Sequence, residues 1–183
     1  MPRILARLPG TVKSVMPAVV VSEYRAPFGP LAVAARGDVL LAIRLEGHPE
    51  RLAKEWAHRE PVERGRLTPA LARAFDAYFA GDIAAIDALE AAPSGTEFQH
   101  AVWDELRRIR AGTTISYSQL AVRIGRPDAV RAVGTANGAN PVPIVIPCHR
   151  VIGANGSLVG YGGGLEMKRW LLAHEGLIPG RLW

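Results

Sequence analysis

A turn-forming stretch at residues 91–95, AAPSG, divides the sequence into two segments with different hydrophobic patterns. Residues 17–45 carry β-branched, partly alternating runs that are typical of strands, whereas residues 96–138 carry apolar side chains at helical spacing. A change of pattern at a linker that contains proline and glycine is typical of a domain boundary. We therefore expect an α+β fold of two domains, residues 1–92 and residues 93–183.

The first segment predicts a small α/β unit. The strand-like runs LAVAAR and VLLAIRL flank Gly37-Asp38, a two-residue connection of the kind that closes a hairpin. Pro49 opens a short helical pattern, and Thr68 precedes a second one in TPALARAFDAYFAG, whose apolar residues share one face. Gly81 is expected to end that second helix. Nothing in this unit is typical of a catalytic site.

The second segment predicts a mainly helical domain. The stretch TEFQHAVWDELRRIRAG predicts a helix that ends at Gly112, and SYSQLAVRIG predicts a short helix closed by Gly125. A further helix is expected at residues 127–137, with Arg131 in its middle. Two short helices joined by a tight turn that contains glycine are typical of a helix-turn-helix. The last pattern, GGGLEMKRWLLAHEG, predicts a C-terminal helix.

Charge and cysteine content limit the classes of function. The formal net charge of +5 favours a polyanionic partner. A single cysteine excludes an internal disulfide and a cysteine-rich zinc site, and neither a signal peptide nor a membrane-spanning run is present, so we expect a cytoplasmic protein. Arg3, Arg7 and Lys13 predict a solvated basic tail, for which a transit peptide is the alternative interpretation.

The second helix of the predicted pair is the one that would meet DNA. Its residues are mostly small, which suits a close approach to a backbone or shallow groove but offers little for reading base edges. If this helix binds DNA, we expect it to do so with little sequence preference. The alternative is an ordinary helix hairpin with a solvated Arg131.

The stretch PIVIPCHRVIG, residues 143–153, contains the only cysteine, Cys148. A thiol becomes nucleophilic as a thiolate, which needs a nearby base, and a thiolate held in this way is expected to have a lowered pKa. His149 adjoins Cys148, but neighbours on an extended segment point in opposite directions, so a bent backbone or a bridging water is required. The alternative is a buried cysteine beside a structural histidine.

The segment NPVPIVIPCHRVIG and the following GYGGGLEMKRWLLAHEG resemble the active-site signature of the 6-O-alkylguanine-DNA alkyltransferases, the methylated-DNA–protein-cysteine methyltransferases. FQHAVWDELRRIRAGTTISYSQLA and RAVGTANGANP resemble that family's preceding segments, and FGPLAVAARGDVLLAIRL resembles its first half more loosely. The resemblance implies a ribonuclease H-like α/β domain without catalytic residues, followed by a mainly helical domain with a winged-helix-like helix-turn-helix.

The resemblance further implies direct, irreversible DNA repair. An alkylated guanine would be flipped out of the duplex, and its alkyl group would pass once from the 6-oxygen to Cys148. His149 would take the thiol proton through a water, and Glu175 would hydrogen-bond His149. Asn140 would order the Cys148 segment, and Tyr117 would crowd the phosphate behind the base and offer its hydroxyl to the departing guanine.

Two larger sets of residues complete the expected site, in which Arg131 would fill the gap left in the base stack. The residues expected to contact DNA are Tyr117, Ser118, Ala129, Arg131, Ala132, Gly134 and Asn137. Those expected to line the substrate pocket are Pro143, Val151, Val159, Tyr161 and Gly162. Val159 stands where the family often keeps a small residue, so we expect it to narrow the pocket. The expected protein is a monomer that binds double-stranded DNA carrying alkylated guanine and uses no cofactor or metal.

Two other functions stay open from the sequence. A helix-turn-helix protein whose Cys148 never reacts would sense alkyl lesions and recruit other repair factors. A Cys-His hydrolase would need turnover, and the sequence shows no obvious oxyanion-hole motif.

Overall fold

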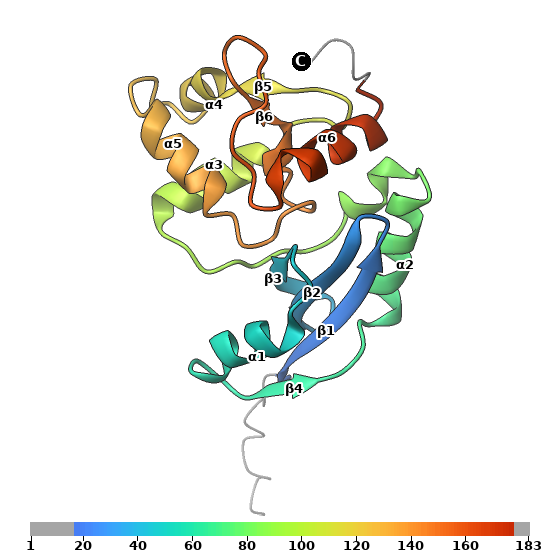
Figure 1. Ribbon diagram of the computed structural model, residues 1–183. Coiled ribbons are helices and arrows are strands. Elements are labelled where there is room, and N and C mark those ends of the chain that lie inside the picture. Colours follow the sequence, from blue (N-terminus) through green and yellow to red (C-terminus); the bar gives the residue numbers. More distant parts are fainter. Residues whose placement is uncertain (1–16, 178–183) are drawn as a thin grey trace, which may run out of the picture.

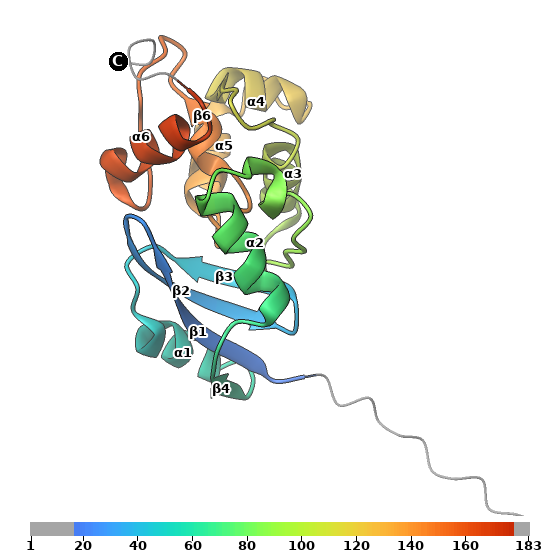
Figure 2. The same ribbon diagram turned by 90° about the vertical axis from the view of Figure 1, so that its right-hand side faces the viewer.

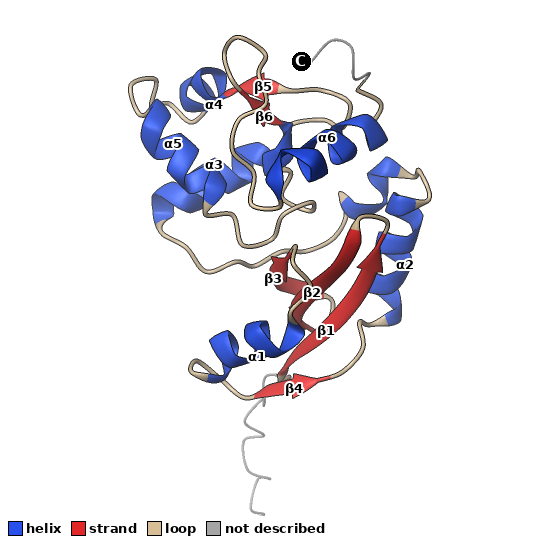
Figure 3. Cartoon of the chain, viewed as in Figure 1, coloured by secondary structure: helices blue, strands red, loops and turns tan. Residues whose placement is uncertain are grey.

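The computed structural model describes residues 17–177, which form two domains (Figure 1). The basic tail expected at Arg3, Arg7 and Lys13 lies outside the described residues. The N-terminal domain contains the larger sheet, and the C-terminal domain is mainly helical (Figure 3). No helix within residues 17–177 is long and apolar enough to span a membrane.

The N-terminal sheet has the strand order β3-β2-β1-β4. Its strands are β1 (Val19–Ala26), β2 (Gly29–Arg36), β3 (Val39–Arg44) and β4 (Val62–Arg64). β1, β2 and β3 form an antiparallel meander, and β4 pairs parallel with β1. The predicted hairpin turn at Gly37-Asp38 is confirmed, and Gly37 has a φ of 59°, a left-handed conformation that glycine adopts without Cβ strain.

Two α-helices and a short 3₁₀ helix complete this domain. α1 (Pro49–Ala57) begins at the predicted proline. α2 (Pro69–Phe79) begins after Thr68, whose side chain accepts a hydrogen bond from the Leu71 amide, as the sequence predicted. The 3₁₀ helix η1 (Ile83–Ile86) follows and leads towards the second domain.

The central strand β2 is buried on both faces because the sheet lies between α1 and α2 (Figures 1 and 2). Side chains alternate along a strand, so successive residues of β2 enter different cores. Ala32 and Ala34 pack with the α1 side chains Leu52 and Trp56. The residues between and beside them pack with α2 and with the C-terminal domain, so one hydrophobic cluster continues from the sheet into the second domain.

The C-terminal domain places its helices around a small parallel sheet. The helices are α3 (Glu97–Leu106), α4 (Tyr117–Arg123), α5 (Val130–Gly138) and α6 (Gly164–His174), and the strands are β5 (Ile115–Ser116) and β6 (Val151–Ile152). α4 and α5 are the predicted helix-turn-helix pair, and Gly125, with a φ of 71°, follows α4 as expected.

The prediction that the helix at residues 96–112 reaches Gly112 was wrong, because α3 ends at Leu106. After Leu106 the backbone tightens into turns with hydrogen bonds three residues apart, from Arg108 to Glu105 and from Ile109 to Leu106. Ile109 is nevertheless buried, so the apolar pattern that predicted a longer helix reflects burial rather than helical backbone.

α5 also begins later than predicted, at Val130 rather than at Pro127. Residues 126–129 form a separate turn, which a hydrogen bond from the Ala129 amide to the Arg126 carbonyl closes. Arg131 therefore lies in the first turn of α5 and not in the middle of the helix.

The segment that precedes Cys148 is fastened to the N-terminal sheet. The Ile43 amide of β3 donates a hydrogen bond of 2.7 Å to the Pro141 carbonyl. Leu40, on the same strand, is hydrogen-bonded to residues 90 and 92, so the interdomain connection also follows β3. The N-terminal domain thus helps to fix the position of the cysteine.

We expect Ser116→Ala to lower the free energy of unfolding by about 1 kcal/mol, because Ser116 caps α4. Its side chain accepts from the Gln119 amide, and the Gln119 side chain accepts from the Ser116 amide. Thr96→Ala, which removes the equivalent cap of α3, is expected to cost a similar amount. Urea denaturation measures both losses, and unchanged unfolding midpoints would contradict this role of the caps.

Candidate active site

The chain reaches Cys148 through a constrained segment. The Asn140 side chain donates from Nδ2 to the Ile146 carbonyl at 2.7 Å and accepts at Oδ1 from the Val142 amide at 3.0 Å. Ile144 has a φ of 77°, a left-handed conformation that costs a β-branched residue on the order of 1–3 kcal/mol. Such strain persists only where the surroundings fix the backbone, and the two Asn140 hydrogen bonds span this residue.

The backbone bends sharply at the cysteine. Residues Cys148–Arg150 form the 3₁₀ turn η2, so of the two arrangements predicted from the sequence, a bent backbone or a bridging water, the bent backbone is present. Cys148 is 6% exposed, and His149 and Arg150 are buried. This turn allows the side chains of His149 and Arg150 to meet the same carboxylate, that of Glu175.

Glu175 follows α6 and accepts hydrogen bonds from three side chains. Arg150 binds it in a bidentate manner, from Nε to Oε2 at 2.7 Å and from Nη2 to Oε1 at 2.8 Å. His149 Nε2 and the Tyr78 hydroxyl each lie 3.0 Å from Oε1. Burial by itself would raise the pKa of Glu175, but the hydrogen bonds from His149 and Arg150 lower it to about 2.

The ionised carboxylate determines the tautomer of His149. A carboxylate with a pKa of about 2 carries no proton near pH 7, so His149 Nε2 must be the donor in their hydrogen bond. Burial lowers the pKa of His149, which keeps the imidazole neutral. Nδ1 is then a proton acceptor, and it is buried without a hydrogen-bond partner among residues 17–177.

The Cys148 thiol is protonated at rest. Burial raises its pKa, against the opposing effects of a hydrogen bond from the Asn140 side chain and the Lys168 ammonium group. This direction is opposite to the lowered pKa expected from the sequence, because removal from water disfavours the thiolate. Reaction of this thiol therefore requires a base close by.

Cys148 lines a cavity of about 250 Å³. Three of the predicted pocket residues, Pro143, Tyr161 and Gly162, line it as well. The Tyr161 hydroxyl is buried, and no group in the described part of the chain hydrogen-bonds it. A substrate with hydrogen-bonding edges can therefore meet polar atoms here.

Val151 and Val159 do not line the cavity. Val151 is buried in β6, and Val159 is 39% exposed, so its side chain does not narrow the pocket as the sequence suggested. Their carbonyl groups instead accept hydrogen bonds of 2.7 and 2.8 Å from Lys168 Nζ. Burial lowers the pKa of Lys168 to about 8.

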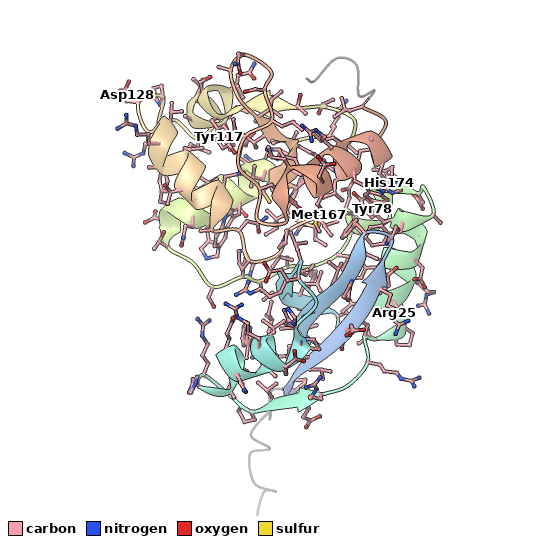
Figure 4. The ribbon with its side chains drawn as sticks, in the orientation of Figure 1. Arg25, Tyr78, Tyr117, Asp128, Met167 and His174 are labelled. Atoms are coloured by element: carbon pink, nitrogen blue, oxygen red, sulfur yellow. The ribbon has the colours of Figure 1, made fainter. Side chains whose placement is uncertain are left out.

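The predicted DNA-contact residues divide between the surface and the cavity. Three of them are exposed on the helix pair: Ser118, Arg131 and Ala132. Ala129 is half-buried. The other three line the cavity: Tyr117, Gly134 and Asn137. Tyr117 begins α4 and lies beside α5 (Figure 4). A Cβ atom on Gly134 would lie 3.8 Å from the Tyr117 ring, an ordinary van der Waals distance, so α5 packs beside Tyr117 at this point.

Three site residues have contacts that the sequence analysis did not assign: Arg150, Lys168 and Tyr78. Arg150 lay within the quoted cysteine motif, and a charged side chain in an otherwise apolar run is a signal of a buried ion pair. Lys168 falls at helical spacing with Leu171 and Leu172, which predicts a buried lysine. Within residues 17–177 no group of three His, Cys, Asp or Glu side chains is arranged to hold a metal ion.

Comparison with known proteins gives matches over both domains. Residues 19–91 match the 6-O-methylguanine DNA methyltransferase, ribonuclease-like domain, and residues 97–177 match the 6-O-methylguanine DNA methyltransferase, DNA binding domain. The methylated-DNA–protein-cysteine methyltransferase of Salmonella typhimurium is 48% identical over 163 residues, which cover 83% of this chain and 92% of that protein. The protein of the same name from Methanosarcina acetivorans is 41% identical over 155 residues, with coverages of 84% and 96%.

A similar fold is present among solved structures. The crystal structure of Mycobacterium tuberculosis OGT in complex with DNA has a TM-score of 0.73 and 41% sequence identity, and the match covers 86% of this chain and 92% of that one. The O6-methylguanine-DNA methyltransferase of Pyrococcus kodakaraensis, at 23% identity, has a TM-score of 0.64 and shares the fold.

We expect Glu175→Gln to lower the free energy of unfolding by about 3–5 kcal/mol, because it leaves the buried Arg150 without a counter-charge. Glu166→Gln is the matched control on α6: Glu166 is exposed and pairs with Arg169 at the surface, so the change is expected to cost about 1 kcal/mol or less. Chemical denaturation measures both, and equal small losses would contradict the role of the ion pair.

The same pair predicts an acid-sensitive component of stability. Glu175 has a pKa of about 2 in the folded protein against an ordinary value of 4.5. A carboxyl group whose pKa is lower in the folded than in the unfolded state stabilises the fold. This stabilisation is complete above the pKa of the unfolded state and is lost as the pH falls through the pKa of the folded state. The free energy of unfolding of the wild type is therefore expected to fall as the pH decreases from about 4.5 to about 2, and Glu175→Gln is expected to lack this component.

Proposed function

The chain belongs to the 6-O-methylguanine DNA methyltransferase family, and we propose that Cys148 is the residue that accepts the alkyl group. The function is direct DNA repair by transfer of a methyl group from DNA to a cysteine of the protein itself. Cys148 is the only cysteine in the sequence. The observation that carries the proposal is its position on the cavity wall, next in the chain to a neutral histidine that Glu175 orients.

The proposed reaction is an in-line displacement at the alkyl carbon. The bond from Cys148 Sγ to that carbon forms while the bond from the carbon to the guanine 6-oxygen breaks, and the electron pair of the broken bond leaves with the guanine. The thiol proton passes through a water to His149 Nδ1, the acceptor atom of the neutral imidazole. The guanine takes up one proton, so the products are a thioether and an unmodified guanine.

The remaining catalytic assignments follow from the same geometry. Glu175 holds the proton of His149 on Nε2 and stabilises the imidazolium that forms, but with a pKa of about 2 it does not take the proton. Asn140 fixes the backbone that leads to Cys148. Burial raises the pKa of Tyr117, so its hydroxyl stays protonated and donates to the departing guanine.

The C-terminal domain binds DNA. We propose that α4 and α5 bind duplex DNA that carries an alkylated guanine, and that the damaged base is flipped into the cavity at a cost of a few kcal/mol. The exposed Arg131 fills the space in the base stack, and the small residues of α5 give little sequence preference. We also propose that the protein acts as a monomer in the cytoplasm, whose reducing conditions preserve the thiol.

The two other functions considered from the sequence are not favoured. A lesion sensor does not need a nucleophile, yet here Cys148 is placed beside a proton acceptor, and relatives at 41–48% identity are named as methyltransferases. A hydrolase must regenerate its cysteine, but a thioether offers no easy leaving group. Each molecule is therefore expected to react once.

We expect Cys148→Ser to retain DNA binding and to lose alkyl transfer, because a hydroxyl is scarcely ionised near neutral pH. Mass spectrometry after incubation with methylated DNA is expected to show a gain of about 14 Da, one CH₂ unit, on the wild-type peptide that contains Cys148 and none on the variant. Repair of more lesions than there are protein molecules, or a gain on another residue, would contradict the proposal.

We expect Arg131→Ala to slow repair of duplex DNA roughly tenfold to a hundredfold, while reaction with free 6-O-methylguanine changes little. The reason is that a free base needs no extraction from a stack. Arg126→Ala is the matched control, because Arg126 is exposed in the turn before α5 and its substitution removes the same charge. Equal losses on both substrates would instead place Arg131 in the chemistry or in the fold.

A further inference from the structure

Tyr78 brings the N-terminal domain into contact with the His149–Glu175 pair. It lies on α2, 97 residues before Glu175, and its side chain is fully buried. Its hydroxyl donates a hydrogen bond of 3.0 Å to Glu175 Oε1, the same oxygen that His149 Nε2 contacts. The domain that supplies no nucleophile therefore supplies a donor to the carboxylate behind the base.

The position of Tyr78 relative to α6 is fixed by His174. Tyr78 and His174 lie next to each other (Figure 4). His174 Nε2 donates to the Tyr78 carbonyl at 2.7 Å, and the two rings meet edge to face with centroids 5.0 Å apart. The His174 ring also stacks on Trp170 at 4.8 Å. Because His174 ends α6 and Glu175 follows it, the backbone and the hydroxyl of Tyr78 contact two consecutive residues at the end of that helix.

We propose that Tyr78 is a positioning residue for the alkyl transfer, whose hydroxyl holds Glu175 Oε1 and thereby determines how strongly that oxygen binds His149. The proposal rests on the assignment of Cys148 and His149 made above. Arg150 fixes the plane of the carboxylate through both oxygens, but Oε1 is shared by three donors. Each donor reduces the negative charge available to the other two.

The hydroxyl acts as a donor at every working pH. Burial, followed by the charge of Glu175, raises the pKa of Tyr78 far above its usual value. The charged groups that act on Tyr78 are Glu175, Arg150 and Asp87. Those that act on His149 are Glu175, Arg150 and Lys168, with the Cys148 thiol next to it in the chain. Removing the Tyr78 hydroxyl leaves all of these side chains in place.

Loss of the hydroxyl has a predictable direction. Oε1 then keeps more negative charge for His149, so the hydrogen bond to Nε2 strengthens and the pKa of His149 rises. His149 accepts the thiol proton only while it is neutral, so the acid limb of the rate profile moves to higher pH. The carboxylate also loses one restraint, which slows the transfer itself.

Tyr78→Phe is the test, because it keeps the ring and removes only the hydroxyl. Tyr24→Phe is the matched control: Tyr24 packs against Phe75 and Phe79 in the same domain, and its hydroxyl also donates to a carboxylate, that of Asp76 at 2.9 Å. Single-turnover methyl transfer is measured from about pH 5.5 to about pH 9, together with DNA affinity.

We expect Tyr78→Phe to transfer roughly threefold to thirtyfold more slowly near neutral pH, with its acid limb shifted upwards and DNA affinity unchanged. Tyr24→Phe is expected to match the wild type in all three measurements. Replacing Tyr78 with 3-fluorotyrosine keeps the hydroxyl and makes it a stronger donor, so that variant is expected to shift the acid limb downwards, and it tests the proposal if the phenylalanine variant does not fold.

A wild-type rate and a wild-type acid limb in folded Tyr78→Phe would overturn the proposal. So would a slower rate with an unshifted limb, since that result would show that the hydroxyl only stabilises the fold. Failure of the proposed function is distinct from both, because wild-type protein would then gain no mass on Cys148.

Discussion

The buried ion pair between Arg150 and Glu175 holds together the segments that form the site. Arg150 belongs to the turn that begins with Cys148, Glu175 follows α6, and Arg150 Nη1 also donates to the Ile109 carbonyl at 2.6 Å. Charges withdrawn from water are tolerated only where hydrogen bonds satisfy them, and donors from both domains do so here. The geometry around the cysteine therefore depends on polar contacts inside the core as much as on apolar packing.

Both domains contribute residues to the surroundings of Cys148, although the sequence placed the whole site in the C-terminal domain. The N-terminal segment carries no catalytic motif, yet Leu45, which follows β3, lines the same cavity as Cys148. The Ile43 amide donates to the Pro141 carbonyl in the segment before Cys148, and Tyr78 donates to Glu175, the carboxylate that also contacts His149. The sheet thus serves as a support against which the turn that contains Cys148 is positioned.

Local signals in the sequence predicted most of the secondary structure, including the hairpin at Gly37-Asp38 and the cap at Thr68. The ends of α3 and α5 were predicted wrongly, because turn hydrogen bonds decide them and hydrophobic periodicity records only burial. In the site, the cysteine motif and the family resemblance predicted that Cys148, His149 and Glu175 belong together, and the hydrogen bond between His149 and Glu175 agrees with this. The direction in which the pKa of Cys148 shifts depends instead on how deeply the thiol is buried, which the sequence alone does not reveal.

The depth of Cys148 has a consequence for how long the protein stays usable. Oxidation and conjugation of cysteine follow the exposure and the thiolate content of the sulfur, and this thiol is 6% exposed with its pKa raised by burial. Both properties are expected to slow oxidation of Cys148 by peroxide and its exchange with small disulfides before the proposed transfer takes place. Because the proposed reaction consumes the only cysteine of the chain, the fold affects how long that thiol persists as well as how it reacts.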